Sequence, residues 1–117
     1  MSTSAKAALL EEYALVARAL SAPARLVILE QLAQGERAVE GVAAKTGLTV
    51  ANCSQHLQHL RRAGLVTNRR AGKAVIYRLT DPRTLALIDL LRLVAERNLA
   101  QVEHILRGLS GGEDAPE

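Results

Sequence analysis

The chain has 117 residues, enough for one domain with a packed core, and 49% of them are hydrophobic. Its only aromatic residues are Tyr13 and Tyr77, so the core must be built from Leu, Val, Ile and Ala, which favours helices. Two rings offer little from which to build a stacking platform for single-stranded nucleic acid, so duplex DNA is the better nucleic-acid candidate.

Cysteine usage and hydropathy predict where the protein resides. Cys53 is the only cysteine, which excludes a disulfide within the chain. The sequence shows neither a charged-then-apolar leader nor an apolar run long enough to span a bilayer. We therefore expect a cytoplasmic protein with no membrane association.

The net charge of +3 is unevenly distributed along the chain. Residues 41–80 contain no Asp or Glu and carry seven cations, whereas the rest of the chain has eight cations and twelve anions. The seven cations are Lys45, Arg61, Arg62, Arg69, Arg70, Lys73 and Arg78. A segment with a charge of +7 is suited to contact a polyanion, although basic runs are also common on ordinary exposed surfaces.

Two amphipathic helices are predicted near the start of the domain. Residues 1–6 and 108–117 lack apolar periodicity, so we expect flexible ends around a domain at 7–107. Apolar residues at intervals of three and four predict a first helix from about Ala7 to Leu20. Ser21 and Pro23 suit the start of a second helix, which Gly35 ends.

Two short helices separated by a tight turn follow. The first runs from about Val39 to Thr46, and Gly47 suits the left-handed conformation that ends a helix. Thr49 can cap the next helix, which Ala63-Gly64 ends. Its expected buried stripe consists of Val50, Cys53, Leu57 and Leu60. This arrangement predicts a helix-turn-helix.

A hairpin and a long helix complete the predicted domain. Residues 65–67 and 75–79 are rich in β-branched side chains and flank a glycine-containing turn at 70–73. Asp81-Pro82 then opens a helix to about Arg107, whose apolar residues occupy more than one face. That surplus of apolar surface predicts a homodimer formed through the first and last helices.

The predicted fold is mainly α with a small β-hairpin, a winged helix-turn-helix with four helices, two strands and a fifth helix. With the apolar stripe of the fourth helix against the core, eight polar or basic residues lie on its outer face or flanks. They are Thr49, Asn52, Gln55, Gln58, His59 and Arg62, with Ser54 and His56 on the flanks. Such side chains can bond base edges and phosphates, so this face is the candidate DNA-reading surface.

Basic residues flank that surface. Arg69, Arg70 and Lys73 are expected at the hairpin tip, where they would reach phosphates or a minor groove. Arg61 and Arg62 end the fourth helix, where they would contact the DNA backbone or complement the helix dipole.

Four stretches of the sequence resemble the ArsR/SmtB family. They are 20–26 (Leu-Ser-Ala-Pro-Ala-Arg-Leu), 47–57 (Gly-Leu-Thr-Val-Ala-Asn-Cys-Ser-Gln-His-Leu), 60–66 (Leu-Arg-Arg-Ala-Gly-Leu-Val) and 70–79 (Arg-Ala-Gly-Lys-Ala-Val-Ile-Tyr-Arg-Leu). The resemblance implies a dimeric repressor that binds an inverted-repeat operator and leaves it when an inducer binds, often a metal ion or a redox signal. The runs at 54–57 and 35–39 are similar to a subgroup associated with rhodanese domains.

The departures from the family concern the inducer. Ala38 and Glu40 stand where the family's thiolate metal site has cysteines. The family's other metal site lies along the last helix, where this chain has Asp89 near the position of one ligand but Leu91, Val102 and Ile105 at the positions of the others. We therefore expect no metal site and no cofactor, and the sequence does not identify the inducer.

Cys53 is a possible redox sensor, because modification of a thiol in the DNA-reading helix would disturb its fit. Its position in the apolar stripe favours instead a small buried core residue, and reactivity would require exposure and a lowered pKa.

Three other functions compete with a sequence-specific repressor. A non-specific architectural DNA-binding protein would use the same basic segment. A winged-helix module could dock an acidic protein on its basic face. An enzyme is the weakest alternative, since no phosphate-binding glycine loop, carboxylate pair or Cys-His couple is recognisable.

Overall fold

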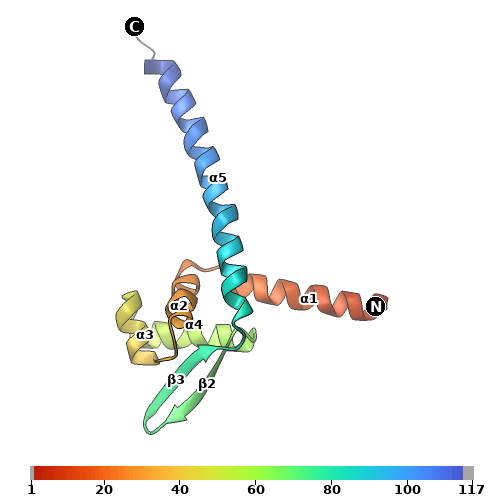
Figure 1. Cartoon of the computed structure of the whole chain (residues 1–117), viewed down its shortest axis with the longest axis vertical. Coiled ribbons are helices and arrows are strands. Elements are labelled where there is room, and N and C mark those ends of the chain that lie inside the picture. The colour runs from red at the N-terminus through yellow and green to blue at the C-terminus, as the bar shows by residue number, and fades with distance from the viewer. Residues whose placement is uncertain (1, 115–117) are drawn as a thin grey trace. The chain divides into compact units, whose positions relative to one another are not determined.

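The computed structural model describes residues 2–114, with side chains described through residue 110 (Figure 1). The chain is mainly helical, with one small antiparallel sheet, as predicted. Its elements are α1 (Thr3–Ala19), α2 (Pro23–Ala33), β1 (Arg37–Ala38), α3 (Val39–Thr46), α4 (Val50–Arg62), β2 (Val66–Ala71), β3 (Ala74–Leu79) and α5 (Arg83–Asp114). Two compact units divide the chain within α5, the first ending at Leu85 and the second beginning at Ala86.

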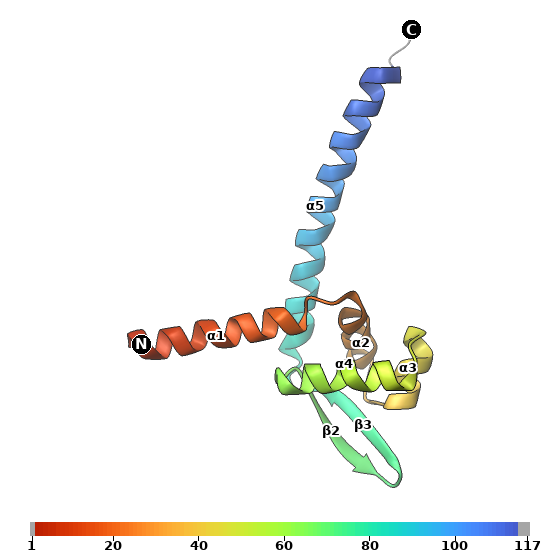
Figure 2. The same cartoon turned by 180° about the vertical axis from the view of Figure 1, so that it is seen from behind.

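The predicted helix-turn-helix is formed by α3 and α4, which pack on each other and on α2 (Figure 2). Gly47 ends α3 in the left-handed region, with φ at 73°, a conformation that glycine adopts without strain. The Thr49 hydroxyl accepts a hydrogen bond from the Asn52 N–H at 3.1 Å and caps α4. The turn between the two helices is therefore only three residues long.

The core of the first unit lies where α2, α3 and α4 meet. Its largest fully buried side chains are Ile28, Leu29, Val42, Cys53, Leu57 and Leu60. The prediction that Val50 belongs to this stripe is wrong, because the residue is 49% exposed. Val50 is the first residue of α4, and helical side chains lean toward the N-terminus, so it extends past the helices that cover Cys53 and Leu57.

The sheet has three strands in the order β1-β3-β2, one more than predicted. Strand β1 pairs Arg37 with Tyr77 and Ala38 with Ile76, and a strand of two residues is too short to show an alternating pattern.

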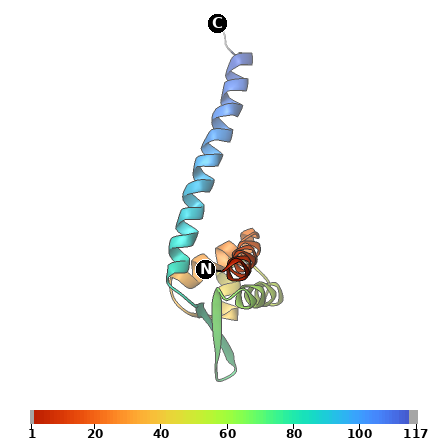
Figure 3. The ribbon, with the colours of Figure 1, turned by 90° about the vertical axis from the view of Figure 1, so that its right-hand side faces the viewer.

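The hairpin of β2 and β3 extends away from the helices of the first unit (Figure 3). It is longer than predicted, because Ala71 pairs with Ala74 and only Gly72 and Lys73 form the turn. The positive φ of Gly72, 64°, suits the first position of such a two-residue turn. The prediction that Arg69 and Arg70 lie at the tip is therefore wrong, since both are paired strand residues of β2.

Both terminal helices extend beyond their predicted ends. Helix α1 begins at Thr3 rather than near Ala7, because Ser2 caps it by accepting a hydrogen bond from the Ala5 N–H at 3.1 Å. Helix α5 continues through Asp114, since an interior glycine costs only about 1 kcal/mol and does not stop a helix. Residue 1 and residues 115–117 of the expected flexible ends lie outside the described residues, and the flexibility of the ends stays a prediction.

Large apolar side chains are exposed on both of these helices. On α1 they are Leu9, Leu10 and Tyr13. On the part of α5 that forms the second unit they are Leu87, Leu90, Leu91, Leu93, Val94, Leu99, Val102, Ile105, Leu106 and Leu109. No helix in the described part of the chain combines the length and apolarity that a membrane span requires.

Candidate nucleic-acid interface

Helix α4 carries the predicted DNA-reading residues on one side and its core residues on the other. Thr49, Asn52, Gln55, Gln58 and Arg62 are exposed, and Ser54, His56 and His59 are half-buried along the two edges of this face. No Asp or Glu occurs in the helix. The face therefore offers amide, hydroxyl and cationic groups without a carboxylate that would repel a nucleic acid.

The edge of α4 away from the wing meets an arginine that sequence reasoning missed. Arg25 of α2 donates from Nε to the Ala19 carbonyl at 2.7 Å and from Nη2 to the Arg18 carbonyl at 3.1 Å. Its Nη1 lies 3.4 Å from Nδ1 of His56. Arg25 thus holds the C-terminal end of α1 to the edge of α4.

A shallow cavity of about 420 Å³ opens beside this arginine. All of its lining side chains are basic or amide groups: Arg25, Gln55, His56, Gln58, His59 and Arg62. A site with guanidinium and imidazole groups and no carboxylate suits the oxygens of a phosphate. Because Arg25 lies 31 residues before His56, only the resemblance to the family motif at 20–26 pointed to it, without indicating this contact.

His59 has a pKa below its ordinary value. Desolvation contributes most to this shift, and the charges of Arg25, Arg62 and His56 contribute further. These neighbouring cations oppose protonation of the ring. An anion placed among them would relieve that repulsion and favour the protonated ring.

The wing contributes fewer free cations than predicted. Arg69 lies on β2 opposite Ile76, and its Nη2 contacts Oε1 of Glu36 at 2.5 Å, so this charge is already paired. Arg70 and Lys73 are exposed, and neither forms an ion pair with any of the described residues. They are the wing residues best placed to reach phosphates.

Cys53 is fully buried in the core beneath the candidate DNA-reading face. Its thiol lies 3.9 Å from the Val39 carbonyl, to which it donates a weak hydrogen bond, and burial raises its pKa. A thiol sensor needs solvent access and a lowered pKa, so the structure does not support that role.

Within residues 2–110, whose side chains are described, no three His, Cys, Asp or Glu side chains are grouped as the ligands of a metal ion would be.

Comparison with known proteins places the chain in a family. The model of the arsR family of bacterial regulatory proteins matches residues 22–68. The biofilm growth-associated repressor of Agrobacterium fabrum is 40% identical over 80 residues, which cover 68% of each chain. The chain belongs to the arsR family. Its members are DNA-binding transcriptional regulators and not enzymes, so the chain is a regulator of this kind.

Two mycobacterial relatives of this arsR-family chain extend the comparison. The transcriptional regulator Rv0324 of Mycobacterium tuberculosis is 45% identical over 97 residues, which cover 83% of this chain but only 43% of Rv0324. The homodimeric winged helix-turn-helix DNA-binding domain of Mb0332 from Mycobacterium bovis, solved by NMR, has 42% identity and a TM-score of 0.76, covering 86% of this chain and 93% of that one. The fold is therefore a winged helix-turn-helix.

Proposed function

We propose that the chain is a homodimeric repressor that binds an inverted-repeat operator in duplex DNA and is released by an inducer. The observation that carries this proposal is the acid-free outer face of α4, bordered by Arg25 and His59 on one edge and accompanied by the exposed wing cations Arg70 and Lys73. Amide groups such as those of Asn52 and Gln55 can read adenine edges, and the cations can contact phosphates.

The exposed apolar residues of α1 and α5 support the homodimer. So many large apolar side chains are rarely left in contact with water on a monomer. The Mycobacterium bovis relative is a homodimer, which fits the same arrangement. A two-fold axis would present two α4 faces to successive major grooves roughly 34 Å apart, so the operator should be an imperfect palindrome.

Release by an inducer requires that the inducer bind the DNA-free state more tightly than the DNA-bound state. Neither a metal ion nor oxidation of Cys53 fits the described residues well. We also propose that the chain is related to the rhodanese-associated subgroup. The run at 54–57 suggests this relationship, and Rv0324 is more than twice as long as its matched region. A cytoplasmic location, where operator DNA is found, belongs to the same proposal.

The proposal is tested by the affinity of the purified chain for its own promoter DNA and for shuffled DNA of the same composition, at two salt concentrations. A repressor binds the promoter at least about a thousandfold more tightly. Equal affinity for both DNAs would indicate an architectural protein, and no binding at low salt would indicate a module that docks a protein.

Two substitutions separate base reading from phosphate contact in this assay. Gln55→Ala should reduce the preference for the promoter by about 1–3 kcal/mol at one base position. Arg70→Gln should weaken binding to both DNAs alike and lower the salt slope by about one. Arg107→Gln, which removes an exposed cation from α5, is the control and should change neither quantity.

A further inference from the structure

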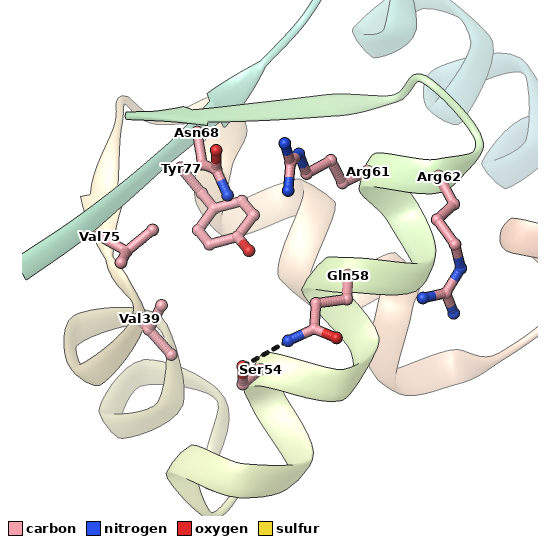
Figure 4. Close-up of a pocket in the computed structure, with 8 residues that line it drawn as sticks. All are labelled: Val39, Ser54, Gln58, Arg61, Arg62, Asn68, Val75 and Tyr77. Atoms are coloured by element: carbon pink, nitrogen blue, oxygen red, sulfur yellow. Dashed lines mark hydrogen bonds between the residues drawn. The ribbon is translucent and has the colours of Figure 1, made fainter. Parts of the chain in front are cut away.

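A second cavity, of about 380 Å³, lies between α4 and the face of the sheet (Figure 4). It is on the opposite edge of α4 from Arg25. Its lining residues are Val39, Ser54, Gln58, Arg61, Arg62, Asn68, Val75 and Tyr77. None of them was predicted from the sequence to form a small-molecule site.

Hydrogen-bond donors from three elements converge on this cavity. Arg61 extends from α4 toward Asn68 of β2 and the ring of Tyr77 on β3, whereas Arg62 points away from that pair (Figure 4). No Asp or Glu is among the lining residues. A guanidinium, a carboxamide and a phenol without a carboxylate form a site for an anion.

The Tyr77 hydroxyl is the most informative group in the cavity. Only 4% of Tyr77 is exposed, and its hydroxyl points into the cavity toward Gln58 (Figure 4). Among the eight lining residues the one hydrogen bond joins Gln58 Nε2 to Ser54 Oγ at 3.4 Å, so the phenol finds no partner among them. Although the ring is buried, its hydroxyl oxygen stays accessible from the cavity, so a bound ligand can accept its hydrogen bond there.

We propose that this cavity binds a small organic carboxylate. Arg61, Asn68 and the Tyr77 hydroxyl hold the carboxylate, and Val39 and Val75 contact its apolar part. The two valines favour a free organic anion over a phosphate of the DNA backbone, because they can contact the apolar part of such an anion.

Occupation of the cavity affects DNA binding directly, an inference that rests on the proposed function. Ser54, Gln58 and Arg62 belong both to the cavity wall and to the DNA-reading surface. A bound anion adds negative charge beside that surface, which repels the phosphates of the DNA. The carboxylate therefore acts as an inducer.

The site itself is tested without DNA, by isothermal titration calorimetry with benzoate and with its neutral counterpart benzamide. Benzoate should bind the native chain and benzamide should not. Tyr77→Phe keeps the buried ring and should weaken benzoate binding about tenfold, the usual effect of losing one hydrogen bond to a charged group. Tyr13→Phe makes the same change at an exposed tyrosine of α1 and should leave binding unchanged.

The regulatory step is tested by titrating promoter DNA with and without saturating benzoate. Benzoate should weaken DNA binding of the native chain and have little effect on Tyr77→Phe. The inference is overturned if benzoate does not bind, if benzamide binds equally, if Tyr77→Phe binds benzoate as the native chain does, or if saturating benzoate leaves promoter affinity unchanged. It is also overturned if Tyr77→Phe loses DNA affinity without benzoate, which would assign the cavity to a DNA phosphate. If benzoate binding depends on Tyr77 but the chain does not prefer its promoter, the anion site is supported and the repressor function is refuted.

Discussion

Burial of Cys53 determines how its thiol behaves. Because its pKa is raised by desolvation, the folded chain retains the thiol proton at pH values where an unfolded chain begins to lose it. This group therefore contributes stability at pH values below the unfolded pKa, and the contribution is lost as the pH rises through the folded pKa.

The first prediction is that Cys53 reacts with a disulfide reagent far more slowly in the folded chain than in denaturant, because both its burial and its raised pKa suppress the thiolate. Absorbance of the released thiol measures the rate. Loss of promoter binding after mild oxidation of the native chain, but not of Cys53→Ala, would contradict this prediction and restore the thiol sensor.

The second prediction concerns His59 and pH. Its lowered pKa keeps the ring neutral in the free chain near pH 7, whereas a DNA phosphate beside Arg25 and Arg62 favours the protonated ring. Binding therefore takes up a proton, and promoter affinity should rise as the pH falls from 7.5 toward 6. Fluorescence anisotropy measures this slope, which His59→Gln should reduce. His104→Gln on α5 is the control, and an equal slope in native and His59→Gln chains would refute the assignment.

Residue-scale predictions from the sequence succeeded where helical periodicity decides the outcome. The spacing of Cys53, Leu57 and Leu60 identified the buried side of α4. The same periodicity misassigned Val50, because it does not show where the covering elements end. Arg25 and Tyr77 gain their roles from contacts between distant segments, which no local pattern contains.

At the scale of elements, the helix-turn-helix and the hairpin were predictable because Gly47, Thr49 and Gly72 carry local turn and capping signals. Strand β1 was not, since its two residues are defined only by their pairing with β3. That strand directly follows Glu36, which forms the ion pair with Arg69 of β2.

The third prediction follows from this ion pair. Glu36→Gln should increase affinity for promoter and shuffled DNA alike, because it removes an acid near the wing and frees Arg69 to contact a phosphate. The salt slope should steepen by up to about one. The free energy of unfolding should change by less than about 1 kcal/mol, as expected for an exposed pair. Glu12→Gln, on α1, is the matched control, and identical DNA affinities for the two variants would count against a role for the pair.

At the scale of the whole molecule, the exposed apolar residues of α5 require an explanation beyond one chain. The fourth prediction is that sedimentation gives twice the chain mass, and that Leu99→Glu shifts it toward the monomer and weakens promoter binding together, since it places a charge in the apolar interface. Asn98→Glu makes the same charge change at the adjacent exposed position and should remain dimeric. A monomeric native chain that still binds the promoter specifically would contradict the dimer.

Hydroxyl-radical footprinting on the promoter tests the central claim most directly, because it shows how many α4 faces contact the DNA and where. A two-fold dimer reading an inverted repeat should protect two similar segments about 10 base pairs apart on one side of the duplex. Protection of a single segment, or of the whole fragment without sequence preference, would contradict the proposal that the chain is a dimeric repressor of an inverted-repeat operator.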